Sequence, residues 1–175
     1  MATHSTVPLP LRITQAIGLT SSSLMTGTAL SISFLFTPIL LQSPSGVLLR
    51  QWASLYGTMK TVAQVNTAIT SASFFYLAYK IHNREISGWL AGYVAAGVLN
   101  VAIVPYTLIV MRGTNGKLLR KEEEVRGLGK MDNAVDITVE GETVHQLVDW
   151  WAVLHLGRCL MLGTGLGLGL WSVLN

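Results

Sequence analysis

Residues 150–173 read WWAVLHLGRCLMLGTGLGLGLWSV, and this stretch indicates the class of fold. It is long enough and apolar enough to cross a bilayer as an α-helix, which takes roughly 20 residues. Yet it carries His155 and Arg158 one helical turn apart. An ionisable group inside a membrane span is costly and is a functional-site candidate by default. The stretch therefore predicts a membrane helix that bears a functional pair of side chains.

Three earlier stretches have a similar character, although the first is rich in Ser and Thr. Half of the 175 residues are hydrophobic and 12% are charged, whereas soluble domains carry about 25% charged residues. The sequence therefore predicts an all-α, integral membrane four-helix bundle of multi-pass topology. An endomembrane is the expected location, although composition does not specify it. We expect one transmembrane domain over residues 1–175, with spans at about 16–41, 62–81, 88–111 and 150–173.

The connections between these spans differ in length. Residues 42–60 contain the breakers Pro44 and Gly46 and are predicted to form a loop. A longer polar loop segment lies between the third and fourth helices. Within it, TNGKLLRKEEEVRGL predicts a surface helix, VDITVEG predicts a short strand, and ETVHQLVDWW predicts a helical lead into the last span.

Each expected span has a polar stripe when its residues are placed at 100° intervals around a helix. Most of these groups are explained by helix packing, because Ser, Thr and Asn commonly join membrane helices for modest energy. The alternate glycines of GTGLGLGL likewise predict surfaces where helices approach closely. The four stripes are Ser22, Thr26, Ser33 and Thr37; Asn66, Thr70 and Ser73; Trp89, Asn100 and Thr107; and Trp151, His155, Arg158 and Leu162.

Arg158 and His155 are not explained by packing alone. The guanidinium keeps its charge, and it lies about 12 Å along the helix from Trp150. Snorkelling toward the headgroups is possible at that depth but awkward. The imidazole of His155 can take up or release a proton near neutral pH. Asp149 lies about 120° around the helix from His155, so a relay within this helix does not follow.

Several site classes have no support in the sequence. There is a single cysteine, Cys159, no histidine-rich box and no glycine-rich phosphate loop. One histidine within the expected bundle argues against a metal site with several protein ligands. The basic residues sit in short loops, as membrane-flanking residues do. We therefore expect no metal, no organic cofactor and no nucleic-acid partner.

Two segments together resemble a known family. NVAIVPYTLIVMRGTNGKLL (100–119) and WWAVLHLGR (150–158) resemble the fungal anthrone oxygenases, which are small four-span membrane proteins formerly classed as a domain of unknown function. Gly113 departs from the pattern, because relatives often have proline there, and this affects the loop geometry. The matching positions are Pro105, Tyr106, Thr107, Met111, Thr114, Asn115, Leu118, Trp151, His155 and Arg158.

The resemblance implies a monooxygenase-type oxidation of a polyketide anthrone, such as emodin anthrone, to the anthraquinone by O₂ in secondary metabolism. The residues suit that chemistry without a cofactor. His155 is the candidate base, and Arg158 is the candidate group that stabilises developing negative charge. Trp151, Trp89 and Tyr106 are candidates for stacking on the planar rings. Asn100, Thr107 and Asn115 are candidates for hydrogen bonds to the substrate hydroxyls.

A non-catalytic four-span scaffold or a small transporter is the alternative. A transporter would be favoured by inverted repeats and broken helices at mid-membrane, and neither is visible in the sequence. A scaffold has no need of an inward-facing ionisable pair. The expected partners are a small aromatic polyketide, O₂ and membrane lipid, and a helix-mediated homo-oligomer is left open.

Overall fold

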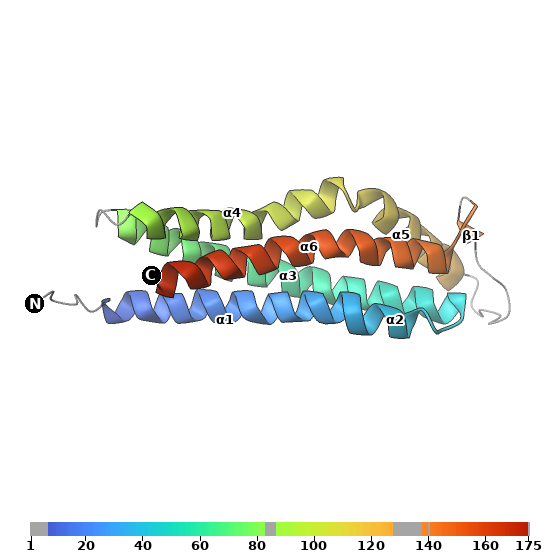
Figure 1. Cartoon of the computed structure of the whole chain (residues 1–175). Helices are drawn as coiled ribbons and strands as arrows, with labels where there is room; N and C mark the ends of the chain where they lie inside the picture. The colour runs from blue at the N-terminus through green and yellow to red at the C-terminus, as the bar shows by residue number, and fades with distance from the viewer. Residues whose placement is uncertain (1–6, 83–86, 128–137, 140, 175) are drawn as a thin grey trace, which may run out of the picture. The chain divides into compact units, whose positions relative to one another are not determined.

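The computed structural model describes residues 7–82, 87–127, 138–139 and 141–174 of the chain. These residues are overwhelmingly helical, so the prediction of an all-α protein is confirmed (Figure 1). A pair of two-residue antiparallel strands is added to the helices. The elements are α1 (Leu9–Ser31), the π-helical turn η1 (Ile32–Phe36), α2 (Thr37–Leu40), α3 (Ser45–His82), α4 (Ser87–Ile109), α5 (Arg112–Gly127), β1 (Thr138–Val139), β2 (Glu142–Thr143) and α6 (Val144–Leu174).

Three helical stretches in the described part of the chain are long and apolar enough to cross a membrane: Leu9–Leu40, Trp89–Ile109 and Val144–Leu174. They overlap the first, third and fourth expected spans, so the protein is a helical membrane protein. The second expected span lies within α3, where Gln64, Asn66 and several hydroxyl residues lower the mean hydropathy. The crossing of the membrane by α3 stays a prediction.

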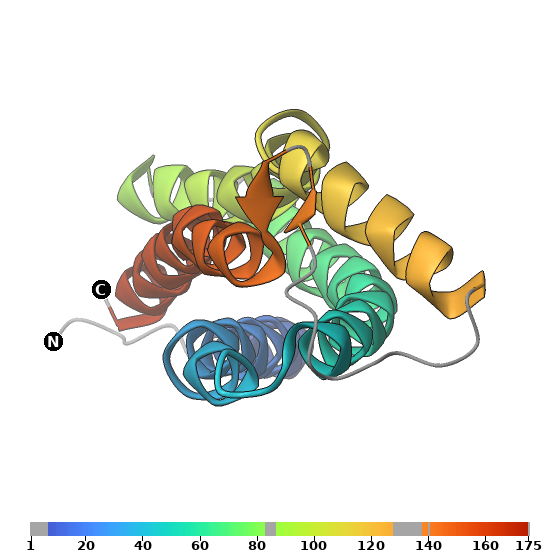
Figure 2. The same ribbon diagram turned by 90° about the vertical axis from the view of Figure 1, so that its right-hand side faces the viewer.

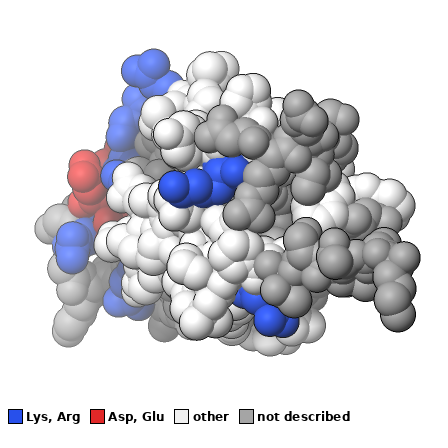
Figure 3. Space-filling view, turned by 90° about the vertical axis from the view of Figure 1, so that its left-hand side faces the viewer, with Lys and Arg blue, Asp and Glu red and all other residues white. Residues whose placement is uncertain are grey.

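The surface of these helices suits a lipid environment. Large apolar side chains stand exposed along them, among them Leu24, Ile109 and Leu160. Figure 3 views the protein from the left-hand side of Figure 1, toward the ends of the helices, and there the Lys and Arg side chains of the described residues form small separate patches. A soluble protein seldom exposes so many large apolar groups, and lipid chains accept them.

The predicted loop over residues 42–60 is wrong, because α3 already begins at Ser45. Pro44 precedes the first turn, and its carbonyl accepts the N–H groups of Val47 and Leu48, each at 2.9 Å. Proline suits the start of a helix, because its missing N–H is not needed there. Leu48 and Trp52 recur at helical spacing and are fully buried, so the segment gains more as a packed helix than as a loop.

The chain divides into two compact units, and α1, α3, α4 and α6 each contribute residues to both. The first unit consists of Met1–Thr26, Val65–Ala102 and Met161–Asn175. The second unit consists of Gly27–Gln64 and Ile103–Leu160. The prediction of one transmembrane domain over residues 1–175 is not tested by this division.

The helices of the first unit pack through aromatic residues and through glycines. Phe74, Leu77 and Tyr93 are fully buried, and Phe74 stacks on Tyr93 at 6.2 Å between ring centroids. The predicted close approach at alternate glycines of α6 is confirmed in part. A Cβ on Gly169 would lie 2.8 Å from the Phe74 ring, and one on Gly165 would lie 3.3 Å from Nδ2 of Asn100. A Cβ on Gly163 or Gly167 would meet nothing within 4 Å.

The core of the second unit surrounds the start of α6. Its buried members are Ile32, Leu48, Leu49, Trp52, Met111, Leu118, Val125, Val144, Leu147, Val148 and Trp151. Figure 2 shows the two short strands directly before the first turn of α6, with α5 beside them. The predicted surface helix is therefore confirmed as α5, and the predicted helical lead as the start of α6. Residues 135–137 and 140 of the expected strand lie outside the described residues.

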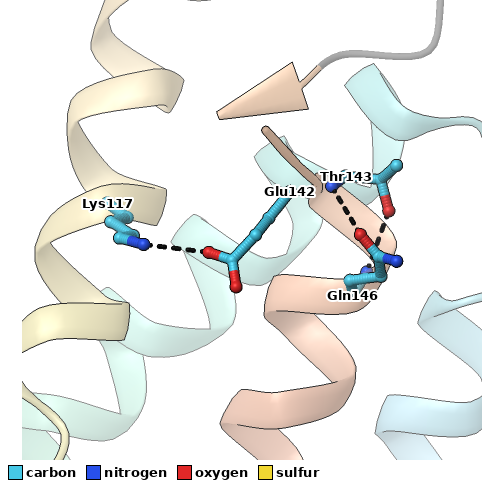
Figure 4. Close-up of polar contacts among 4 residues, drawn as sticks. All are labelled: Lys117, Glu142, Thr143 and Gln146. Carbon is cyan, nitrogen blue, oxygen red and sulfur yellow. Dashed lines mark hydrogen bonds and ion pairs between the residues drawn. The ribbon is translucent and has the colours of Figure 1, made fainter. Parts of the chain in front are cut away.

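Side chains fix where α6 begins (Figure 4). The backbone N–H of Thr143 donates to Oε1 of Gln146 at 2.9 Å, and the N–H of Gln146 donates to Oγ1 of Thr143 at 3.2 Å. This reciprocal pair is a capping box, which satisfies free N–H groups of the first turn. Lys117 of α5 pairs with Glu142 at 2.9 Å. Together these contacts set the start of the helix that carries His155 and Arg158.

Candidate functional site

The candidate site lies on α6 in the second unit, between Trp151 and Cys159. Trp151, His155 and Cys159 are 4%, 3% and 6% exposed, and Arg158 is half-buried. Spacings of three and four residues place these side chains on neighbouring rows of one helix face. Of the predicted stripe, Trp151 and His155 are therefore buried, whereas Arg158 is buried only in part.

His155 is held by contacts on two sides. Its ring stacks on Trp151 with centroids 5.0 Å apart and planes 29° apart. Its Nδ1 lies 2.9 Å from Oγ of Ser33, which comes from the π-helical turn η1. Sγ of Cys159 lies 3.6 Å from Ser33 Oγ and 3.8 Å from His155 Nδ1. The imidazole is thus oriented by residues of two helical segments.

A row of aromatic rings extends from His155 through Trp151 to α3. Trp52 meets Trp151 edge-on, with centroids 5.8 Å apart and planes 88° apart. Tyr56 stacks on Trp52 at 5.2 Å and 13°. Offset stacking and edge-on contacts are the favoured geometries of aromatic pairs. Nε1 of Trp151 donates to Oδ1 of Asn115 at 2.9 Å, which orients the central indole.

Arg158 lacks a counter-charge in contact. The side chains of Cys159, Tyr56 and Tyr106 lie near it, and no carboxylate of the described residues forms an ion pair with it. Its Nε is buried and has no hydrogen-bond partner. Buried donors almost always find acceptors in folded proteins, so an unused guanidinium N–H beside a row of aromatic rings suits an anionic oxygen of a ligand.

Tyr106 packs directly against the turn between His155 and Arg158. Its hydroxyl donates to the carbonyl of Leu154 at 2.8 Å. A Cβ on Gly157 would collide with the Tyr106 hydroxyl, so the absence of a side chain at Gly157 lets the phenol lie there. Thr107, the next residue, instead donates to its own helix at the carbonyl of Ile103 (2.8 Å).

The residues proposed from the sequence fall into both units. Tyr106, Thr107, Asn115, Trp151, His155 and Arg158 lie in the second unit, whereas Asn100 and Trp89 lie in the first. Nδ2 of Asn100 donates to the carbonyl of Ala96 at 3.0 Å, and its buried Oδ1 has no partner. Trp89 packs against the core of the first unit.

Four residues of the cluster were not predicted from the sequence as site residues: Ser33, Trp52, Tyr56 and Cys159. Trp52 and Tyr56 lie in residues 42–60, which were predicted to form a loop and so were not placed on a helix face. Their spacing of four residues, beside an apolar run, is the sequence feature that indicates a shared helix face. Ser33 was assigned to helix packing, and no local signal points from it to His155. Among the described residues there is no group of three or more His, Cys, Asp or Glu that could hold a metal ion.

Comparisons with known proteins now bear on this cluster. The sequence profile of the anthrone oxygenases matches residues 52–168. An anthrone oxygenase of Aspergillus fumigatus is 30% identical over 168 residues, which cover 90% of this chain and 91% of that protein. The chain belongs to the anthrone oxygenase family.

Further relatives of this family member carry related names. An anthrone oxygenase of Aspergillus novofumigatus is 32% identical over 83% of each chain. A noranthrone monooxygenase of Aspergillus flavus is 26% identical over 91% of this chain and 73% of that protein. No solved structure matches the chain. The protein is thus an oxygenase enzyme, and the matched region begins at Trp52 and includes the turn of α6 with His155 and Arg158.

Proposed function

We propose that this protein oxidises a polyketide anthrone of the emodin-anthrone class to the anthraquinone with O₂, without a cofactor, as a step of aromatic polyketide biosynthesis at an endomembrane. Family membership supports the anthrone substrate class. The observation that carries the proposal is the Nε–H of Arg158, buried without a partner and one helical turn from the buried His155.

The chemistry begins at the methylene between the anthrone rings. His155 removes one methylene proton as a general base. The resulting anion is delocalised onto the carbonyl oxygen of the central ring and passes an electron to O₂. The substrate radical and superoxide then combine and take up a proton, which gives a hydroperoxide. Loss of water leaves the carbonyl, so one oxygen atom enters the product and the other leaves as water.

Arg158 would act at the oxygen on which negative charge develops. A preorganised cationic donor is worth much more in a water-poor site than in water. The unused Nε–H leaves a direction free for that oxygen. In this role Arg158 binds the delocalised anion more tightly than the neutral anthrone, which lowers the barrier to deprotonation.

The second unit also supplies candidate contacts for the flat rings and the hydroxyls of the substrate. Trp151 and Tyr106 offer aromatic surface next to His155 and Arg158. Thr107 and Asn115 are proposed hydroxyl partners, although both have protein partners in this structure. Asn100 and Trp89 of the first unit stay predictions. Apolar anthrones partition into lipid, so a membrane enzyme meets its substrate at high local concentration.

Helix α3, which contains the second expected span, is the remaining helix that we propose to cross the membrane. Helix α3 has 38 residues and extends about 57 Å at 1.5 Å per residue, well beyond the thickness of a bilayer core. We therefore propose that α3 crosses with the other three helices, as one transmembrane domain.

The test is anthraquinone formation and O₂ uptake by microsomes supplied with emodin anthrone. Wild type is compared with His155→Ala and Arg158→Ala at matched protein level, with empty microsomes correcting for oxidation by air. His82→Ala serves as the matched control, since His82 is exposed at the end of α3. Wild type and His82→Ala should exceed the blank, and both site variants should fall toward it.

Two outcomes would contradict the proposal in different ways. If wild type does not exceed the blank with several anthrones, the substrate class is wrong and a scaffold role gains support. If the two site variants keep the wild-type rate, the oxidation stands but the His155–Arg158 mechanism does not.

A further inference from the structure

We propose that Ser33 is a positioning residue that holds His155 as the Nδ1–H tautomer and leaves Nε2 as the base. This inference rests on the proposed function, because it assigns the atom of His155 that takes the substrate proton. It draws on the contact between Ser33 Oγ and His155 Nδ1 at 2.9 Å. That contact joins the N-terminal helical run to the turn of α6 that carries Arg158.

The backbone presents Ser33 through an irregular turn. Helix α1 passes into the π-helical turn η1 at Ile32, and both the N–H and the Oγ1 of Thr37 donate to the carbonyl of Ile32. Pro38 follows at once and has no N–H for an α-helical bond, while its ring would crowd the carbonyl of residue 34. One wide turn removes that conflict. Such turns occur mostly as single insertions, frequently at functional sites.

The contacts among Ser33 Oγ, His155 Nδ1 and Cys159 Sγ favour one direction for the hydrogen bonds. A neutral imidazole has one donor and one acceptor nitrogen. If Nδ1–H donates to Ser33 Oγ, the hydroxyl can donate in turn to Cys159 Sγ at 3.6 Å. If Ser33 donated to Nδ1 instead, its oxygen would accept from the weak thiol donor. The first arrangement gives every strong donor an acceptor.

This direction has a consequence for proton transfer. With the proton on Nδ1, the lone pair of Nε2 faces away from Ser33 and is available to the substrate. After Nε2 takes a proton, Nδ1–H still donates to Ser33, so no hydrogen bond must reverse during the step. The bond made by one ring nitrogen thereby sets the role of the other. Stacking on Trp151 keeps the ring plane in place throughout.

Two measurements test this assignment. The first is the nitrogen NMR spectrum of histidine-labelled, detergent-solubilised wild type, with the His155 signals identified by their loss in His155→Ala. We expect the neutral ring to carry its proton on Nδ1. The second is steady-state kinetics of Ser33→Ala and Ser33→Thr with an anthrone. We expect kcat of Ser33→Ala to fall about tenfold, the equivalent of one lost hydrogen bond, with KM nearly unchanged and partial recovery in Ser33→Thr.

Ser73→Ala is the matched control. Ser73 is a buried serine of α3, and its Oγ donates to the carbonyl of Ile69 in its own helix at 2.8 Å, so that hydroxyl donates no hydrogen bond to α6. Its kinetics and the His155 spectrum should match those of wild type. If the serine hydroxyls had only a structural role, Ser33→Ala and Ser73→Ala would both yield less folded enzyme. The proton of the His155 ring would then stay on the same nitrogen in both variants.

A proton on Nε2 of His155 in wild type would overturn the inference, and this result does not depend on whether any Ser33 variant folds. An unchanged kcat in Ser33→Ala would overturn it as well. Failure of the proposed function is distinguishable from both, because an enzyme inactive on anthrones would still report its tautomer. If the enzyme oxidises anthrones while His155 carries its proton on Nε2, the proposed oxygenase function stands and the proposed role of Ser33 is wrong.

Discussion

The two compact units each contain a partly buried polar cluster, and the two clusters differ in kind. In the first unit, Nδ2 of Asn66 donates to the carbonyl and the Oγ of Ser21 at 3.0 and 2.9 Å. Thr70 donates to the same Oγ at 3.0 Å. These groups are neutral and satisfy one another. In the second unit, the cluster contains the ionisable His155 and Arg158.

The buried atoms left without a partner sharpen this difference. In the described part of the first unit they are oxygens, those of Ser22, Ser71 and Asn100. In the described part of the second unit they are nitrogens, Nε1 of Trp52 and Nε of Arg158. Neutral hydroxyl and amide clusters are common means of joining membrane helices. Unused N–H donors beside aromatic rings suit a planar ligand that carries oxygens.

The largest effect is expected at Arg158. Replacing it by Gln keeps a polar side chain but removes the positive charge, and we expect kcat for anthrone oxidation to fall by about 10²-fold. Arg158→Lys should fall between Gln and wild type, because ammonium is a point charge without the planar fork of donors. Anthraquinone formation in microsomes measures both. Equal rates in all three enzymes would place the charge outside the reaction.

The next comparison pairs one asparagine from each unit. Asn115→Ala leaves the buried Trp151 indole N–H without its acceptor, and we expect a loss of about 1–3 kcal/mol in unfolding free energy. Asn100→Ala removes an amide that bonds its own helix, and we expect a loss below about 1 kcal/mol. Unfolding of the solubilised proteins by SDS measures both changes. A fall in anthrone oxidation by folded Asn100→Ala would instead support the predicted substrate contact of Asn100.

A pair of glycines on α6 tests the packing of Tyr106. Gly157→Ala must displace the Tyr106 ring from the turn between His155 and Arg158, and we expect about a tenfold loss of kcat/KM from the misplaced groups. Gly167→Ala is the control, because nothing lies within 4 Å of a Cβ there. Steady-state kinetics with an anthrone distinguishes the two. Similar kinetics for both variants would mean that the position of Tyr106 is unimportant to the reaction.

The smallest effect on activity is expected in the first unit. Asn66→Ala breaks the contacts with Ser21, and we expect a loss of about 0.5–1 kcal/mol in unfolding free energy with unchanged kcat per folded enzyme. SDS titration together with kinetics at matched folded protein measures both. A lower kcat per folded enzyme in Asn66→Ala would contradict the view that only the cluster of the second unit takes part in the reaction.

Composition and periodicity alone determined the helical membrane class and the polar face of α6. The apolar runs are long enough to cross a bilayer, and spacings of three and four residues align Trp151, His155 and Arg158 on any α-helix. The same periodicity is present at Leu48 and Trp52, and Pro44 and Gly46 do not break it. Proline interrupts a helix interior and yet suits its first turn, so α3 is longer than the sequence-based prediction.

The pairing of residues from different helices was decided by tertiary structure alone. Nothing local to Ser33 points to His155, since 122 positions separate them, and their contact depends on the wide turn η1 and on the start of α6. The same holds for Trp151, whose partners Asn115 and Trp52 come from other helices. A helix pattern specifies which side of a helix is buried. Which side chains meet there depends on the rotation and axial shift of each helix, and the summed packing of the core sets these.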